Sequence, residues 1–224
     1  MPKLYIVATP IGNLKDITLR ALETLKEVDL ILCEDTRVTK RLLEHYDIKT
    51  KFESYHQHSN LKKVDYILNL FEQGKNLALV SDCGTPGIND PGDKLVKEAI
   101  KIGVEIIPIP GPSAVTAILS VLGAPADKFT YMGFPPHKKG RQTMFKEISE
   151  SKYPVVIYES VHRIIKALKE LNVFGEFDIV IGRELTKKFE TIYRGKIKDI
   201  INQLEKEGPK GEFVIIINQL KNEK

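Results

Sequence analysis

The chain has 224 residues, a net charge of +4 and 42% hydrophobic residues, which fits a globular protein of one large domain or two small ones. The mild positive charge is compatible with an RNA partner without requiring one, because a lysine-rich surface gives the same balance. With two cysteines, no apolar run near the roughly 18 residues of a membrane span and no evident signal peptide, we expect a cytosolic protein without a disulfide framework.

The first half of the chain alternates between short apolar runs and amphipathic stretches. Asp16 is expected to cap a helix that contains Leu19, Leu22 and Leu25, and further helices are predicted over 39–46, 60–73 and 93–102. Strands are predicted at 4–8, 29–33, 52–55, 77–80 and 104–108. Strands that alternate with helices in this way favour a mainly parallel sheet covered by helices.

Three of these strands run into loops rich in proline, glycine and polar residues. The longest loop follows Val80 and extends to Gly92, and the others follow Ala8 and Pro108. Glycine allows a close backbone approach to a ligand and proline stiffens a loop, so a ligand cradle is favoured over a plain turn. The carboxyl ends of parallel strands share one edge, so we expect the three loops to line one pocket for a polar, adenosine-sized cofactor.

The pattern pauses at 123–128, which predicts a boundary between a domain at 1–122 and a domain at 123–224. The second half is also predicted to be α/β, with a mixed sheet. Its strands are predicted at 129–134, 155–158, 179–181, 190–193 and 212–218, and its helices at about 141–149, 164–171 and 197–205.

Several familiar catalytic patterns are missing from the sequence. It has no Gly-x-Gly-x-x-Gly fingerprint, no P-loop, no Gly-x-Ser-x-Gly elbow and no Cys-x-x-Cys, so oxidoreductase, NTPase, hydrolase and zinc-protein classes lose their usual support. His56 and His58 could bind a metal, but no further His or Cys with ligand spacing lies near them, and no metal site is predicted.

Charged clusters mark other strand ends. Lys138, Lys139 and Arg141 could contact phosphates or simply form a solvated loop. The cluster around Glu159 could form part of an active site or cap a helix. The acidic and basic residues at 34–37 could equally form an internal salt bridge.

The order of these motifs resembles one known family. The chain is similar, from about Lys3 to Leu220, to the ribosomal RNA small subunit methyltransferase I group of the tetrapyrrole methylase superfamily. Each motif alone is weak, but their common order is specific. The segments that carry the resemblance are Thr9–Leu14, Glu34–Arg37, Ser81–Gly87, Pro110–Ala114, Gly133–Pro136, Glu159–Arg163 and Gly182–Lys187.

The resemblance implies two α/β domains of the tetrapyrrole methylase type, with S-adenosyl-L-methionine in the cleft between them. It also implies a homodimer and methyl transfer to a cytidine ribose 2′-hydroxyl in the decoding region of 16S rRNA. The residues that it assigns to the cofactor are Pro10, Ile11, Gly12, Asp82, Gly84, Thr85, Ser113, Ala114, Tyr158 and Glu212.

Such a transfer needs a group that takes the hydroxyl proton, because a ribose hydroxyl is a poor nucleophile. Asp35, Glu159 and His162 are the candidates for this catalytic role. The basic residues expected to hold the RNA phosphates are Arg37, Lys138, Lys139, Arg141 and Arg163.

Two other functions remain open at the level of the sequence. One is a methyltransferase of the same superfamily that acts on a tetrapyrrole or another small molecule. The basic loop at Lys138 and the sequences of the motifs argue against this function. The other is a non-catalytic RNA-binding protein on the same fold, which would not bind the cofactor.

Overall fold

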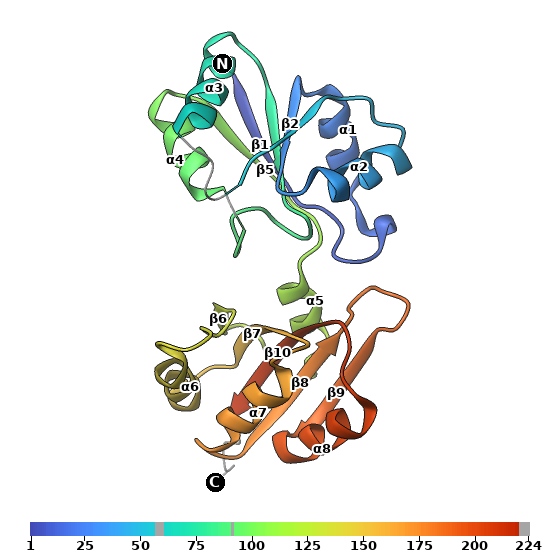
Figure 1. The fold of residues 1–224 in the computed structure, drawn as a ribbon, viewed down its shortest axis with the longest axis vertical. Helices are drawn as coiled ribbons and strands as arrows, with labels where there is room; N and C mark the ends of the chain where they lie inside the picture. Colours follow the sequence, from blue (N-terminus) through green and yellow to red (C-terminus); the bar gives the residue numbers. More distant parts are fainter. Residues whose placement is uncertain (57–60, 91, 220–224) are drawn as a thin grey trace. The chain divides into compact units, whose positions relative to one another are not determined.

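The computed structural model describes residues 1–56, 61–90 and 92–219 (Figure 1). The chain divides into two compact units, unit 1 (Met1–Ser113) and unit 2 (Ala114–Lys224), each built on its own five-stranded sheet. The boundary between the two units lies before helix α5 (Ala114–Ser120). The predicted boundary at residue 122 lies after this helix. The reason is packing, because Val115, Ile118 and Leu119 of α5 are buried against the sheet of unit 2.

Unit 1 is a parallel sheet with the strand order β3-β2-β4-β1-β5. All four pairings between neighbouring strands are parallel, which confirms the prediction for this half. Pro108 is tolerated because β5 is an edge strand, where a missing N–H breaks no ladder. The strands are β1 (Lys3–Val7), β2 (Leu30–Cys33), β3 (Phe52–Ser54), β4 (Leu77–Val80) and β5 (Glu105–Ile109).

Helices cover both faces of this sheet, and each face has its own apolar core (Figure 1). Helices α1 (Leu19–Glu27) and α2 (Thr36–His45) bury Leu25 and Leu43 on one face. Helices α3 (Leu61–Glu72) and α4 (Asp93–Lys101) bury Ile67 and Leu95 on the other. A sheet covered on both faces leaves its edges and strand ends as the places where polar groups can gather.

The start of α1 differs from the expectation. Asp16 lies in a short 3-10 helix, η1 (Leu14–Asp16), and Thr18 caps α1 instead, its hydroxyl oxygen accepting a hydrogen bond from the Ala21 N–H at 3.1 Å. Helix α2 begins three residues earlier than predicted, because the Asp35 side chain caps it.

Unit 2 has a mixed sheet with the strand order β6-β7-β10-β8-β9, as predicted. Only the β6–β7 pair is parallel among the neighbouring strands of this sheet, and the other three pairs are antiparallel. Helix α5 covers one face, and the other three helices cover the opposite face. The strands are β6 (Thr130–Gly133), β7 (Val155–Ser160), β8 (Phe177–Arg183), β9 (Thr191–Lys196) and β10 (Glu212–Gln219), and the three helices are α6 (Arg141–Glu150), α7 (Ile164–Asn172) and α8 (Ile197–Glu207).

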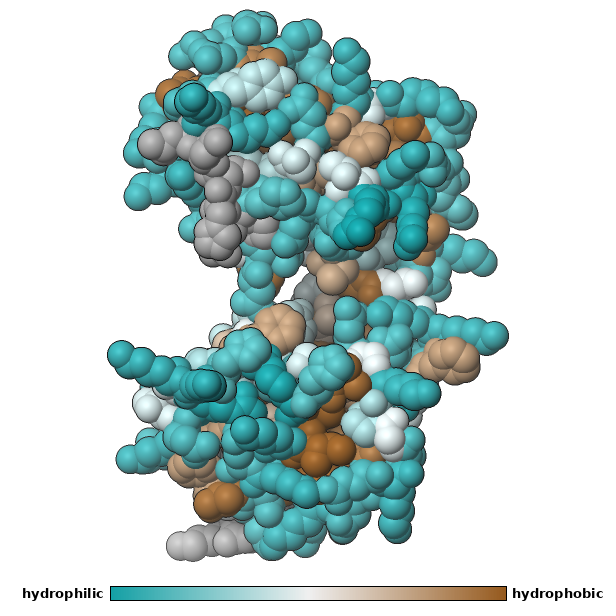
Figure 2. All heavy atoms as spheres, in the orientation of Figure 1, coloured by the Kyte–Doolittle hydropathy of each residue, from teal (hydrophilic) through white to brown (hydrophobic). Residues whose placement is uncertain are grey.

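The visible face of both units is largely hydrophilic, with hydrophobic residues scattered among the polar ones (Figure 2). This agrees with a charged-residue content of 29%. Within the described residues, the helices lack the combination of length and apolarity that crossing a membrane requires.

Candidate active site at the strand ends of unit 1

Three strand-end loops of unit 1, which the sequence analysis expected to line one pocket, lie at the same edge of the sheet. Thr9 and Gly84 exchange two backbone hydrogen bonds of 2.9 and 3.0 Å, and the Thr9 hydroxyl donates to the Ser81 carbonyl oxygen at 3.0 Å. Gly84 adopts a φ of +80°, which favours glycine. A Cβ atom there would lie 3.7 Å from Ile11 and 3.8 Å from the carbonyl oxygen of Pro112. The loops after β1 and β4 are therefore joined at Gly84, and the loop after β5 starts beside them, where the Ala8 N–H donates to the Ile109 carbonyl oxygen at 3.2 Å. Of these three loops, only the one after β4 lines the described cavity, through Asp82.

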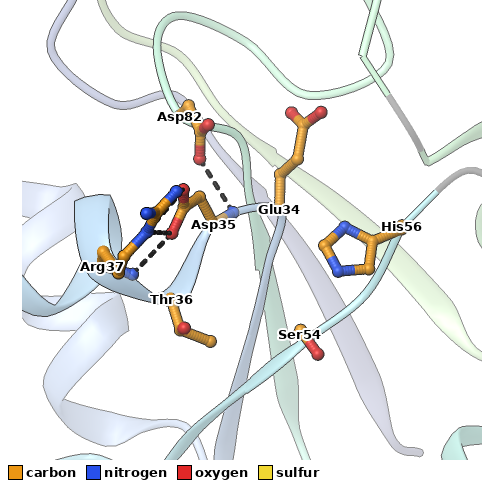
Figure 3. A pocket seen from close by; sticks show the side chains of 7 residues that line it. All are labelled: Glu34, Asp35, Thr36, Arg37, Ser54, His56 and Asp82. Atoms are coloured by element: carbon orange, nitrogen blue, oxygen red, sulfur yellow. Dashed lines mark hydrogen bonds and ion pairs between the residues drawn. The ribbon is translucent and has the colours of Figure 1, made fainter.

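A polar cavity of about 520 Å³ opens beside these loops, at the ends of β2, β3 and β4 (Figure 3). This volume falls in the range of small-molecule sites, roughly 300–1,000 Å³. Its walls carry carboxylates, an imidazole, a guanidinium and hydroxyl groups, all from unit 1. The lining residues are Glu34, Asp35, Thr36, Arg37, Ser54, His56 and Asp82.

Asp35 links several parts of the cavity wall by hydrogen bonds. Its carboxylate accepts a hydrogen bond from the Arg37 N–H at 2.8 Å and so caps α2. The Arg37 guanidinium grips the same carboxylate, with contacts of 3.1 and 2.6 Å to Oδ2. The Asp35 N–H in turn donates to Asp82 Oδ1 at 3.0 Å, which joins the ends of β2 and β4.

The hydrogen bonds from the Arg37 side chain and from its backbone N–H lower the pKa of Asp35 to about 2. A carboxylate with so low a pKa is a weak proton acceptor, and both of its oxygens are engaged. The geometry therefore gives Asp35 a positioning role in the cavity wall.

Glu34, the neighbour of Asp35, has a different environment. It is half-buried, and the carboxylates of Asp82 and Asp90 lie close enough to act on it. Burial and these two negative charges raise the pKa of Glu34 above its ordinary value, while His56 acts in the opposite sense. Burial likewise raises the pKa of Asp90. Sequence analysis did not select Glu34 or Asp90 as site residues, although Glu34 lies in a quoted motif and Asp90 lies in the long loop after Val80.

The candidates in unit 2 form a separate, buried network. The Glu159 side chain is 0% exposed and accepts from Arg163 Nη2 at 2.8 Å and from Arg141 Nη1 at 3.5 Å. Arg141 also donates to Glu170 Oε2 at 2.5 Å. The two arginines then reach the loop after β6, where Arg163 donates to the Pro135 carbonyl oxygen at 3.1 Å and Arg141 to that of Pro136 at 3.2 Å.

This network changes the interpretation of two RNA-contact candidates. Arg141 is only 5% exposed, so it supports the loop from within and does not present its charge at the surface. Arg163 is half-buried and serves the same loop. Lys138, Lys139 and His162 are exposed, as a contact with RNA or solvent requires.

The remaining cofactor candidates lie in several local environments. In unit 1, Pro10 is buried, Ile11, Thr85 and Ser113 are half-buried, and Gly12 is exposed. In unit 2, Ala114 begins α5, and the Tyr158 ring lies 5.3 Å from that of Phe134 and 5.5 Å from that of Tyr131. Glu212 begins β10, and its carboxylate accepts from Lys187 at 2.8 Å.

Metal binding finds no support within the described ranges, where no group of three or more potential metal ligands occurs. The pairing of His56 with His58 remains untested, because His58 lies outside the described residues. The loops around Gly84 fit a different kind of ligand. A glycine cradle that a Cβ atom would fill, with carboxylates and hydroxyl groups beside it, suits a small polar molecule that carries amino and hydroxyl groups.

The grip of Arg37 on Asp35 can be tested by titration. In the wild type we expect the Asp35 carboxyl to titrate at about 2, and in Arg37→Gln to titrate closer to its ordinary value of 3.8. A depressed folded-state pKa stabilises the protein above the unfolded-state value, and this stabilisation is lost as the pH falls from about 4 to about 2. Carboxyl ¹³C chemical shifts measure the midpoint. Lys40→Gln on the same helix is the control, and an unchanged Asp35 midpoint in Arg37→Gln would contradict the assignment.

The buried network predicts that Glu159 stabilises unit 2. We expect Glu159→Gln to lower the free energy of unfolding by about 3 kcal/mol, because buried Arg141 and half-buried Arg163 lose a charged partner. Urea denaturation followed by circular dichroism measures the change. Glu150→Gln is the matched control, since that carboxylate pairs with Lys146 at the surface. Equal stabilities of the two variants would show that the network contributes little.

Comparison with known proteins identifies the family. The family model of the Tetrapyrrole (Corrin/Porphyrin) Methylases matches residues 3–201. A protein of Thermotoga maritima named ribosomal RNA small subunit methyltransferase I is 43% identical over 219 residues, which are 97% of this chain and 99% of that protein. A protein of the same name from Mycoplasmopsis pulmonis is 48% identical, over 96% of this chain and 97% of that protein. Another from Escherichia coli O157:H7 is 44% identical, over 96% of this chain and 77% of that protein.

Solved structures share the fold at lower identity. The cobalt precorrin-4 methyltransferase CbiF superposes with a TM-score of 0.71 at 21% identity, over 96% of this chain and 94% of that one. The methyltransferase CobJ gives a TM-score of 0.72 at 17% identity, over 98% and 95%. The sequence match and the shared fold agree: the chain belongs to the tetrapyrrole (corrin/porphyrin) methylase family and, within it, to the group named ribosomal RNA small subunit methyltransferase I.

Proposed function

We propose that this protein transfers a methyl group from S-adenosyl-L-methionine to the ribose 2′-hydroxyl of a cytidine in the decoding region of small-subunit rRNA. The choice of substrate rests on a contrast in sequence identity between two groups of similar proteins. Relatives named for ribosomal RNA are 43–48% identical over nearly the whole chain. The structures named for corrin and porphyrin chemistry are 17–21% identical and support the fold alone.

The proposed cofactor site uses the loops that meet around Gly84. Ile11, Gly84 and Thr85 would hold the cofactor largely through backbone groups, and Asp82 would face it from the end of β4. When bound, S-adenosyl-L-methionine supplies the methyl group from a positively charged sulfonium. The carboxylates of the neighbouring cavity favour such a charge electrostatically. Pro10, Gly12, Ser113, Ala114, Tyr158 and Glu212 remain proposed cofactor contacts.

The proposed RNA contacts come from both units. Arg37 lies at the mouth of the cavity, with 87% of its side chain exposed, and can reach a phosphate while still pairing with Asp35. In unit 2, exposed Lys138 and Lys139 can neutralise phosphates. Phe134 is 52% exposed beside Tyr158 and offers a ring on which an unpaired base can stack. Arg141 and Arg163 act by fixing the loop that carries these groups.

The three residues that the sequence suggested as proton acceptors differ in how available their side chains are. Asp35 is engaged by Arg37, and Glu159 is buried between two arginines, so we propose positioning roles for both. His162 is exposed and remains a candidate for the proton acceptor. We further propose that the protein acts as a homodimer in the cytoplasm, where its rRNA substrate is found.

The central test is to map the modification. We expect labelled methyl groups from S-adenosyl-L-methionine to appear at one cytidine of small subunits prepared from cells that lack the gene. Ribose methylation at that nucleotide would be recognised by its resistance to alkaline cleavage. Bare rRNA and a porphyrinoid form the comparison arms. Label in the porphyrinoid would favour the tetrapyrrole alternative, and calorimetry without cofactor binding would favour a non-catalytic RNA-binding protein.

The basic loop gives a second prediction. We expect Lys138→Ala with Lys139→Ala to weaken RNA binding and to reduce the slope of log K against log[salt] by about 0.7 for each lost contact with single-stranded RNA. Filter binding at several salt concentrations measures the slope. The control is Lys146→Ala with Lys198→Ala, which removes two surface lysines paired with Glu150 and Glu176. Equal slopes in the two double variants would argue against phosphate contacts at the loop.

A further inference from the structure

Among the three acidic residues that line the cavity, Asp35 and Asp82 accept hydrogen bonds from described residues, whereas neither carboxylate oxygen of Glu34 does. It follows directly on β2, and its side chain extends away from those of Asp35 and Arg37 (Figure 3). Asp82 binds the Asp35 N–H at 3.0 Å and thereby fixes the backbone beside Glu34. Among the described residues, no hydrogen bond to the Glu34 carboxylate is formed, whereas Arg37 occupies both Asp35 oxygens.

The charges that face Glu34 come from three segments. Asp82 and Asp90 lie on the loop after β4, Asp35 precedes α2, and His56 follows β3. The three carboxylates disfavour a negative charge on Glu34, and His56 favours it. Burial is the largest influence and raises the Glu34 pKa further. A general base works best when its pKa lies near the working pH, so the surroundings move Glu34 in the direction that this task needs.

We propose that Glu34 accepts the proton of the attacking ribose hydroxyl, in the cavity that it lines with Arg37 and His56. This inference rests on the proposed function. The ribose oxygen forms a bond to the methyl carbon, the carbon–sulfur bond breaks with its electron pair on sulfur, and the hydroxyl proton passes to a carboxylate oxygen of Glu34. The sulfonium charge is thereby neutralised and Glu34 becomes a neutral acid.

The other cavity walls support this role. Thr36 and Ser54 add hydroxyl groups that can orient a sugar, and Arg37 lies where a flanking phosphate would be held. The volume of about 520 Å³ leaves room for a small ligand. Asp35 cannot replace Glu34 as the acceptor, because Arg37 holds its pKa at about 2.

The first test compares Glu34→Gln with Glu44→Gln. The first variant keeps the shape of the side chain and removes the base, and the second alters an exposed carboxylate that pairs with Lys40 on α2. In single-turnover methylation of small subunits we expect a loss of about 10²-fold or more for Glu34→Gln and wild-type rates for Glu44→Gln. Calorimetry measures the affinity of all three proteins for S-adenosyl-L-methionine, and the single-turnover rates are compared at saturating cofactor, so that weaker cofactor binding is not mistaken for loss of the base.

The second test needs no activity. In ¹³C-glutamate-labelled protein, the carboxyl signal that disappears in Glu34→Gln should titrate above 4.5, the ordinary value for glutamate. Asp90→Asn removes one of the facing charges and should lower that midpoint. In the wild type, the single-turnover rate should fall as the pH falls through the measured Glu34 pKa, because the protonated acid cannot accept a proton. The same limb should move to lower pH in Asp90→Asn.

The outcomes separate this inference from the proposed function. If the wild type does not methylate small subunits, the proposed function is wrong. If it does, and Glu34→Gln reacts within threefold of the wild-type rate, Glu34 is not the acceptor. Glu34→Asp is a second variant in case Glu34→Gln misfolds, because it keeps the carboxylic acid on a shorter side chain. We expect it to react about 10-fold more slowly than the wild type and to keep the fall in rate at low pH. A wild-type rate, or an absent limb, in a folded Glu34→Asp protein would overturn the proposal.

Discussion

The parallel direction of all the strands in unit 1 is the constraint on which the candidate site depends. Since the carboxyl ends of parallel strands share one edge, polar segments that are far apart in the sequence are brought together there. Thr9 and Gly84 are joined by two hydrogen bonds across this edge, and Asp82 binds the backbone of Asp35. Strands β2 and β4, whose residues are all buried, provide the rigid support that such a site requires.

Two adjacent carboxylates in this site have opposite properties. Asp35 is ionised by the grip of Arg37 and by a backbone N–H, and it holds the start of α2 in place. Glu34 points to the other side, where burial and like charges disfavour its ionised form. Their division of roles follows from environment and not from residue type, as in other enzymes that use paired carboxylates.

Much of the fold could be predicted from periodicity and strand-end chemistry, including the parallel sheet and the position of three loops at one of its edges. Other features depended on packing that a sequence does not display. The helix that begins at Ala114 could belong to either unit, and only the burial of Ile118 on the second sheet decides it. Asp16 was predicted to cap α1, but it lies in the short helix η1, and Thr18, which has an extended backbone, caps α1 instead.

The roles of charged residues were harder to predict, because charge in a sequence carries no information about depth. Arg141 resembled a surface cation next to Lys138 and Lys139, yet it is buried against Glu159. Glu34 lay in a quoted motif, but its distinction from Asp35 needed the direction of each side chain. The resemblance identified the family. The structure was needed to separate residues whose side chains are engaged within the protein from residues whose side chains can contact a ligand.

The two proline carbonyls held by Arg141 and Arg163 have a consequence for binding. Prolines restrict the backbone of the loop at Pro135 and Pro136, and the guanidinium groups anchor it on the side facing the core. A segment ordered in advance loses little conformational entropy when a partner arrives, so more of the contact energy appears as affinity. The buried charges of unit 2 thus order this loop during folding, before any partner is bound.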